Sequence, residues 1–354
     1  MKKEDVKNTD AVRTYLKDLQ EFPKYVLTEE DKKSIQSDRV MWMTRKLLLK
    51  RFRKTKLYEE TEKDILNKIT LSIEKDEPVH LIILFGGYKH FWNPSYPRVD
   101  WAELFNLRFM SELVAPLLTV HKPGVVLDYG SEDVIMTMMD NYPEKDLDAY
   151  ASSFEELLEF YTKYVPSNFK ISYVRTGRKY DSDKLKNKIT ESLPNKRTEW
   201  DKLSSEEKEK RLKRSRRSLV WNGQEDWTKL NQKEREEKII VSKIIEDTFY
   251  EVEAEFLGDY FTGGTHIPVV LSWGLSDENA THWLTLGSTF ASTTDFWIGR
   301  GVLEIQSSRI VPRVVSQKQY GAIKDRLQKI SVKEFTIKGF GSIETGESIS
   351  FNGP

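Results

Sequence analysis

The segment PVHLIILFGGYKHFWNPSYP at residues 78–97, together with VVLDYGSED at residues 125–133, indicates the fold of this chain. Residues 79–85 form an apolar run with the length of a strand buried on both faces, and two glycines follow it directly. Many α/β enzymes place a site at the carboxyl edge of a parallel sheet, where buried strands give way to glycines, lysine and carboxylates. Residues 78–133 are therefore the candidate site.

The residues between these two strands have the spacing of a helix. From residue 101 to about residue 120, apolar side chains recur at helical intervals, at Leu104, Phe105, Phe109, Leu113, Leu117 and Leu118. Lys122, Pro123 and Gly124 end this helix before the second strand at 125–128. Strand, helix and strand over about fifty residues predict a right-handed parallel crossover.

The same alternation continues along the chain. Predicted helices cover residues 131–165 and 239–256, and predicted strands cover residues 169–174, 267–273, 283–287 and 301–306. The last two strands have hairpin-like spacing, so we expect antiparallel additions to the sheet in the C-terminal third. The predicted fold class is α/β, with a Rossmann-like, mostly parallel sheet and flanking helices.

Composition divides the chain into four predicted parts. They are an N-terminal helical segment at 1–75, the first half of an α/β core at 76–178, a charged insertion or lid at 179–237, and the second half of the core with a C-terminal hairpin at 238–354. In the insertion, Ser204 and Glu207 have the spacing of a capping box that starts a charged helix. The basic cluster at 211–217 is best interpreted as a solvated face of that helix.

Charge and composition exclude several classes of protein. The 354 residues contain 56 basic and 56 acidic side chains, which gives no bulk-charge argument for a nucleic-acid or membrane-surface protein. The absence of cysteine excludes disulfides, thiolate catalysis and sulfur-ligated metal sites, and with five histidines a metal centre would have to rely on carboxylates. We expect neither a metal nor a cofactor. The charged start of the chain and the lack of any apolar run near 18 residues lead us to expect a cytoplasmic protein.

The first cluster of candidate site residues follows the first strand. Its members are Gly86, Gly87, Lys89, Asn93, Asp100 and Glu103. The glycines allow a ligand to approach backbone N–H groups, and the lysine supplies a cation for a phosphate or carboxylate. Asp100 and Glu103 also have the spacing of a capping box before an apolar stripe, so a structural role and a catalytic role are both open.

A second cluster follows the second strand and contains Asp128, Ser131 and Asp133. An acidic residue and a glycine near the end of a parallel strand resemble the nucleotide-binding start of a Rossmann methyltransferase. Gly130 stands alone, however, and is followed by two carboxylates, which repel phosphate. This acidic loop suits hydroxyl groups or an ammonium group better.

Two further candidates lie late in the chain. His282 precedes Trp283 between a polar turn and a strand, where it is either a general acid or base or a structural residue. Arg300 lies between two glycines and is either a bidentate clamp for a carboxylate or phosphate or a turn residue.

The order of these elements resembles the isocyanide (isonitrile) synthases of the pyoverdine and dityrosine biosynthesis family. The similar elements are the strand at 81–85, Lys89, Asn93, the pair Asp100 and Glu103, the turn Pro123-Gly124, and the acidic segment 131–133. The likeness is one of layout over about two thirds of the chain. The sequence departs from the family at 270–274, where VLSWG lacks the family's arginine and histidine.

The resemblance implies an enzyme of secondary metabolism, a transferase or lyase, that condenses an amino-acid amine with a pentulose phosphate to form an isocyanide. It implies that Lys89 and Arg300 hold anionic groups, that Asp100 or Glu103 moves protons, that Asp133 contacts the amine or hydroxyls, and that His282 assists. The expected partners are small molecules, an amino acid and a sugar phosphate, with a homodimer as an option and neither membrane nor nucleic acid.

Two other functions stay open. An S-adenosylmethionine-dependent methyltransferase would use residues 128–133 to hold its cofactor. A non-catalytic binding protein would use the basic helix at 211–217 and exposed aromatic side chains for a macromolecular partner.

Overall fold

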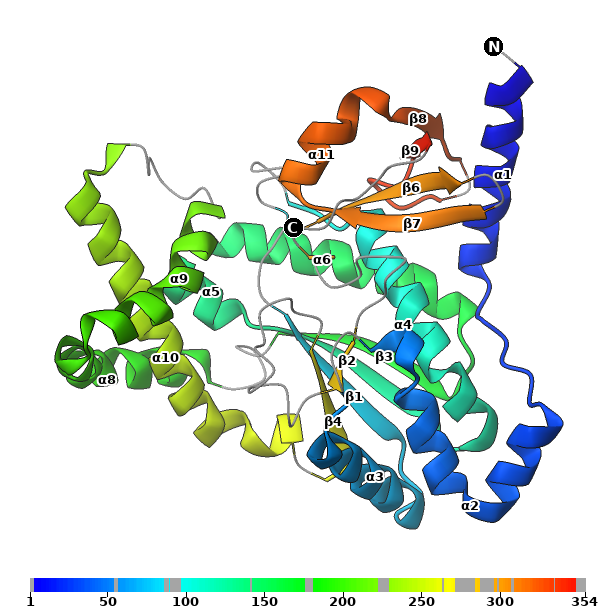
Figure 1. The fold of residues 1–354 in the computed structure, drawn as a ribbon, viewed down its shortest axis with the longest axis horizontal. Coiled ribbons are helices and arrows are strands. Elements are labelled where there is room, and N and C mark those ends of the chain that lie inside the picture. Colours follow the sequence, from blue (N-terminus) through cyan, green and yellow to red (C-terminus); the bar gives the residue numbers. More distant parts are fainter. Residues whose placement is uncertain are drawn as a thin grey trace.

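The computed structural model of the chain contains two sheets, and helices surround the larger one (Figure 1). The structure describes residues 3–53, 57–85, 89, 97–140, 142–175, 181–221, 229–262, 264–270, 284–286, 296–297, 299–306, 309–333 and 335–347. The candidate residues Gly86, Gly87, Asn93 and His282 lie outside the described residues.

The larger sheet is parallel throughout its described pairings. Its strands are β1 (Val79–Phe85), β2 (Val125–Ser131), β3 (Phe169–Arg175), β4 (His266–Val270) and β5 (Leu284–Thr285), in the order β3-β2-β1-β4-β5. The central strand β1 is buried because both faces of its apolar run are covered. The strand order reverses between β1 and β4, which is the kind of switch point at whose carboxyl edge open α/β sheets bind ligands.

Helices α4 (Trp101–Val120), α5 (Asp133–Asp140) and α6 (Glu144–Tyr161) connect the first three strands. The apolar stripe predicted for the first of them is buried along α4. Phe85 and Tyr129, from β1 and β2, meet Phe154 of α6 in an aromatic layer, and Tyr129 donates a hydrogen bond of 2.7 Å to Asn106 of α4. This layer fixes both helices against the sheet.

The first part of the chain forms α1 (Lys3–Gln20), α2 (Glu29–Leu47), a 3-10 turn η1 (Lys50–Phe52) and α3 (Glu59–Glu74). Thr28 is the N-cap of α2, with a capping box in which its hydroxyl accepts from the backbone N–H of Asp31. After α6 come the 3-10 turn η3 (Thr162–Tyr164) and the strand β3.

The charged region contains three helices, α8 (Ser182–Lys202), α9 (Ser205–Trp221) and α10 (Gln232–Thr262). The predicted capping box is present, because the Ser204 backbone N–H donates to Glu207 at 2.9 Å and the Glu207 backbone N–H donates to the Ser204 hydroxyl. A small apolar cluster joins the three helices, made of Trp200, Leu212, Ile239 and Ile244. None of the helices that the structure describes combines the length and apolar character needed to cross a membrane.

The second sheet lies in the C-terminal third and holds antiparallel strands. It consists of β6 (Arg300–Gln306), β7 (Arg309–Val315), β8 (Gln328–Ser331) and β9 (Ser342–Glu347), with α11 (Gln317–Ile323) and the 3-10 turn η6 (Lys324–Arg326) between β7 and β8. β6 pairs antiparallel with β7 and parallel with β9, and β8 pairs antiparallel with β9. The predicted α/β class with antiparallel strands late in the chain is confirmed.

The assignment of these strands differs from the prediction in one respect. The hairpin expected between residues 283–287 and 301–306 is wrong, because β5 pairs in parallel with β4 while β6 belongs to the second sheet. Spacing along the chain indicates where strands occur, but pairing depends on which edge each strand finds in space.

The second sheet packs on the start of α4 (Figure 1). The Trp101 indole N–H donates to the carbonyl of Ser342 at 2.8 Å, and its ring meets Phe335 and Phe340 edge to face. Gly301 of β6 comes so close that a Cβ atom there would lie 2.4 Å from the backbone nitrogen of Ala102. Only glycine permits this approach.

Candidate active site

Lys89 lies buried between two carboxylates at the N-terminus of α4. Its Nζ is 2.6 Å from Asp100 Oδ1 and 2.7 Å from Glu103 Oε2. Lys89 is 1% exposed and Glu103 is fully buried. The three residues form one charged cluster in which Lys89 and Glu103 are shielded from water and the Asp100 side chain is 24% exposed.

The helix start positions both carboxylates. Asp100 is the N-cap of α4 and accepts from the backbone N–H of Ala102, while Glu103 accepts from the backbone N–H of Asp100 at 2.8 Å. Asp100 Oδ1 also accepts from the backbone N–H of Gly301 at 3.2 Å, so the second sheet supports the cluster. The predicted capping box is confirmed, and the same two carboxylates hold Lys89.

Tyr150 of α6 completes the surroundings of Glu103. Its hydroxyl donates to Glu103 Oε1 at 2.9 Å. Burial raises the pKa of Glu103 to about 7, against the Lys89 ammonium, which lowers it, and with the Asp100 carboxylate, which raises it further. Near neutral pH, this carboxyl group is therefore poised to accept or release a proton.

The donors around Glu103 differ in what they can do when it is protonated. The ammonium of Lys89 and the backbone N–H of Asp100 only donate, so neither can accept a hydrogen bond from a carboxylic acid. The Tyr150 hydroxyl donates to the carboxylate and can rotate to accept from the acid. Tyr150 thus provides a partner for Glu103 in both protonation states.

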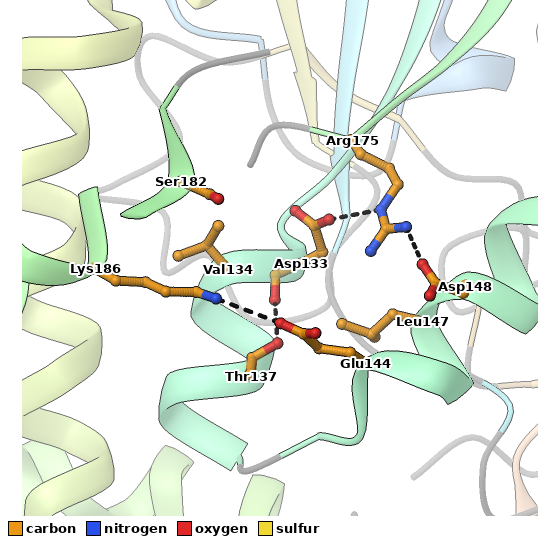
Figure 2. Close-up of a pocket in the computed structure, with 9 residues that line it drawn as sticks. All are labelled: Asp133, Val134, Thr137, Glu144, Leu147, Asp148, Arg175, Ser182 and Lys186. Atoms are coloured by element: carbon orange, nitrogen blue, oxygen red, sulfur yellow. Dashed lines mark hydrogen bonds and ion pairs between the residues drawn. The ribbon is translucent and has the colours of Figure 1, made fainter. Parts of the chain in front are cut away.

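A cavity of about 190 Å³ opens at the carboxyl edge of β2 and β3 (Figure 2). Its walls come from the starts of α5, α6 and α8 and from the last residue of β3: Asp133, Val134, Thr137, Glu144, Leu147, Asp148, Arg175, Ser182 and Lys186. Arg175 contacts two carboxylates of the lining: Nε donates to Asp133 Oδ2 at 2.7 Å, and Nη1 contacts Asp148. Among the described residues, the lining of this cavity includes neither Lys89 nor Arg300.

Asp128 and Ser131 have different surroundings. Asp128 lies in the middle of β2, where Oδ2 is 2.8 Å from His80 Nε2 and Oδ1 accepts from the Ser172 hydroxyl. Ser131, three residues later, is on the other face of the sheet because side chains alternate along a strand. It is fully buried and hydrogen-bonds Tyr173.

Arg300 starts β6 and lies within the second sheet. Its Nε is 2.9 Å from Glu344 Oε2, and its guanidinium covers the ring of Tyr320 at 5.0 Å. Its neighbour Gly301, rather than its own side chain, reaches Asp100. The structure thus brings Lys89, Asp100 and Glu103 together, while Asp133 lies with Arg175 and Arg300 with Glu344.

Five residues of the Lys89 cluster and the cavity, each charged or in contact with Glu103, are absent from the candidates drawn from the sequence, namely Tyr150, Asp148, Arg175, Glu144 and Lys186. Arg175 could have been found, because it directly follows a predicted strand and so must reach the same sheet edge as Ser131. Tyr150 and Asp148 occur within an amphipathic helix, where a sequence pattern predicts which face is buried but not which side chains meet. Among the described residues, no group of three or more histidine, aspartate or glutamate side chains is arranged to hold a metal ion.

Comparisons with known proteins give a relationship of fold. No family model matches this chain, and no curated protein sequence matches it. Its structure resembles the crystal structure of the PvcA protein from Pseudomonas aeruginosa, with a TM-score of 0.59 and 16% sequence identity. The match covers 86% of this chain and 99% of PvcA, so the two proteins share a fold over most of this chain.

Proposed function

We propose that this chain is a biosynthetic enzyme similar to isocyanide synthases. In this reaction, the amine of an amino acid condenses with the carbonyl of a pentulose phosphate, and elimination then leaves the isocyanide carbon. Two independent likenesses support the proposal. The order of motifs in the sequence resembles that family, and the fold resembles PvcA, a protein of the pyoverdine and isocyanide synthase family.

The observation that carries the proposal is the buried cluster of Lys89, Asp100 and Glu103. Three residues of the motif on which the sequence resemblance rests contact one another, with Nζ-to-oxygen distances of 2.6 and 2.7 Å. Condensation of an amine with a carbonyl requires proton transfers at nitrogen and at oxygen. A carboxyl group with a pKa of about 7 suits such transfers near neutral pH.

The geometry suggests a division of roles within the cluster. Glu103 is the proton carrier, because its pKa lies near neutrality and Tyr150 can serve both of its protonation states. Lys89 already contacts two carboxylates, so we do not assign it to a substrate anion. Its role is to adjust the pKa of Glu103. Asp100 keeps Lys89 in position while it caps α4.

The two alternative functions receive no comparable support. A methyltransferase would need residues 128–133 for its cofactor, whereas Asp128 is engaged with His80 and Ser172 in the middle of a strand. A binding protein would need the basic cluster of α9, where Arg211 lies 3.5 Å from Asp247 of α10. Binding of S-adenosylmethionine, or salt-dependent retention on nucleic acid, would favour one of them.

The test is product formation by the purified protein. Each of the twenty amino acids is incubated with a pentulose phosphate, and isocyanide is sought by mass spectrometry. We expect Glu103→Gln to lower the rate by about 10²- to 10⁴-fold, because it keeps the shape and loses the proton transfer. Lys89→Ala and Asp100→Ala should abolish the reaction.

The matched control is Asp31→Asn, since Asp31 is also a buried carboxylate in a capping box beside a lysine, but belongs to α2. It should keep the wild-type rate, and circular dichroism should show that every variant is folded. The reaction is wrong if the wild type makes no isocyanide from any amino acid. The role of Glu103 is wrong if Glu103→Gln retains the rate within a few-fold.

A further inference from the structure

The cavity at the carboxyl edge of β2 and β3 has charges of both signs on its walls. Asp133, Glu144 and Asp148 supply three carboxylates, and Arg175 and Lys186 supply two cations. The part of the lining that the structure describes therefore carries one net negative charge when all five groups are ionised. Such a lining disfavours a phosphate dianion and accommodates an ammonium group.

Arg175 is held in one orientation. Nε and Nη1 are engaged by Asp133 and Asp148, and the guanidinium is planar, so the position of Nη2 is set by the other two nitrogens. Figure 2 shows this remaining nitrogen directed toward the space between Asp133 and Leu147. Among the described residues, Nη2 has no hydrogen-bond partner, so it is available to a carboxylate in the cavity.

Lys186 and Glu144 provide a second, looser pair on the other side of the cavity. Lys186 Nζ is 3.4 Å from Glu144 Oε1, and the two side chains are 32% and 68% exposed. An ion pair that is this long and this exposed contributes little to stability. A charged group of a ligand can therefore replace either member of this pair at a small cost in free energy.

The size of the cavity limits the ligand. About 190 Å³ is below the roughly 300–1,000 Å³ of sites for drug-sized molecules, so the cavity suits a small molecule better than a whole nucleotide or S-adenosylmethionine. Val134 and Leu147 add apolar surface beside the charged groups. The combination fits a small molecule with an ammonium, a carboxylate and a short apolar portion.

We propose that this cavity binds the α-amino acid substrate, with its ammonium against Asp133 and Glu144 and its carboxylate against Arg175 Nη2 and Lys186. The choice of an amino acid as the occupant rests on the proposed function.

The experiment measures binding and needs no turnover. Calorimetry and saturation-transfer NMR are run on the wild-type protein with each of the twenty L-amino acids and with inorganic phosphate. For the amino acid that binds most tightly, the α-hydroxy acid lacking the ammonium and the amine lacking the carboxylate are then compared with it. We expect each analogue to bind at least tenfold more weakly, and phosphate not to compete.

Two variants test whether the binding occurs in this cavity. Glu144→Gln and Lys186→Met change partly exposed side chains, so the fold should persist. We expect each to weaken amino-acid binding about tenfold. Their controls are Glu159→Gln on α6 and Lys184→Met on α8, two exposed residues outside the lining, which should bind as the wild type does.

The outcomes separate this inference from the proposed function. If no amino acid binds, if phosphate competes, or if both variants bind like the wild type, the cavity is not the amino-acid site. If the variants form isocyanide with an unchanged KM, the inference is overturned and the reaction stands. If the variants bind weakly but the wild type makes no isocyanide, the cavity assignment stands and the reaction is wrong.

Discussion

Asp31 in α2 and Glu103 in α4 occupy the same local motif with opposite consequences. Each is the third residue of a helix and accepts from the backbone N–H of its N-cap, at 3.1 Å from Thr28 and 2.8 Å from Asp100. Each also accepts from a tyrosine hydroxyl at 2.9 Å and lies within 2.8 Å of a lysine. By sequence and by contact, the two sites look alike.

Their proton affinities nevertheless differ in direction. Burial by itself raises the pKa of Asp31, but hydrogen bonds from Lys46, Trp42, Thr28 and Tyr25 together hold it below its usual range. Burial raises the pKa of Glu103 to about 7 in spite of Lys89. The difference has two causes: Glu103 is more completely shielded, and it shares its lysine with a second carboxylate, Asp100.

The comparison shows which features of a capping box allow its carboxylate to exchange a proton. The cap itself is structural at both sites, and it does not make either carboxylate reactive. Complete burial and a second negative charge change the Glu103 site from an ion pair that stabilises a helix into one that exchanges protons near neutral pH.

Replacement of the lysine at each site should give the largest difference in stability between the two sites. Lys89→Met leaves two carboxylates without their buried cation, so the free energy of unfolding should fall by about 3–5 kcal/mol at pH 7. Lys46→Met should cost about 1–3 kcal/mol, because Lys46 is 19% exposed and Asp31 keeps three other donors. Urea denaturation measures both, and equal costs would contradict the contrast between the sites.

The two carboxylates should also give opposite dependences of stability on pH. The pKa of Glu103 is raised from its ordinary 4.5 to about 7, so its stabilising effect is complete below pH 4.5 and disappears as pH rises to about 7. The pKa of Asp31 is lowered, so its contribution is present above its ordinary pKa of 3.8 and disappears as pH falls further.

Urea denaturation of the wild type and of Glu103→Gln at several values from pH 4 to pH 8 measures this effect. Between pH 4.5 and 7, the wild type should lose stability relative to the variant, with a slope of at most about 1.4 kcal/mol per pH unit. Asp31→Asn should show no such relative change in that range. A flat difference for Glu103→Gln would mean that Glu103 stays ionised throughout.

Removal of a single hydroxyl group should test the role of Tyr150. Tyr150→Phe removes a hydrogen bond that favours the ionised form, so the pKa of Glu103 should rise by about one unit. Tyr129→Phe is the control, because Tyr129 is also fully buried and donates to a neighbouring side chain, Asn106. NMR titration of protein with 13C-labelled glutamate measures both, and an equal shift in the control would remove the special role of Tyr150.

The smallest expected effect is at the cap of α2. Thr28→Ala removes the hydroxyl that accepts from the Asp31 backbone N–H at 3.1 Å and should cost about 1 kcal/mol of unfolding free energy. The Asp31–Lys46 pair should persist, so the pH dependence below pH 4 should remain. Loss of that pH dependence in the variant would show that the cap is needed to hold the ion pair.

Local patterns in the sequence predicted the parts of this protein that depend on neighbouring residues. The apolar run at 79–85 predicted β1, and Asp100 and Glu103 predicted the start of α4, because capping acts over three residues. The contact of Tyr150 with Glu103 joins residues 47 positions apart, and the contact of Gly301 with Asp100 joins residues 201 positions apart. No spacing rule includes such pairs.

The same limit explains the second sheet and the cavity. The strand at 301–306 was predicted from its composition and the strand at 309–315 was not, and their separation from β5 depends on packing against α4. For the cavity, Asp133 was predicted from its position after a strand, while Asp148 and Lys186 reach it from helices that only the folded chain brings together. The roles of the candidate residues stay predictions until the experiments above are done.

Gly301 connects the second sheet to the Lys89, Asp100 and Glu103 cluster at the N-terminus of α4. Its N–H donates a hydrogen bond to Asp100 Oδ1, and its missing Cβ lets β6 approach α4. If β6 moved away from α4, Asp100 would lose this donor, and the contacts of Trp101 with Ser342, Phe335 and Phe340 would be disturbed. The position of the second sheet is thus coupled to the hydrogen bonds that hold the Lys89 cluster.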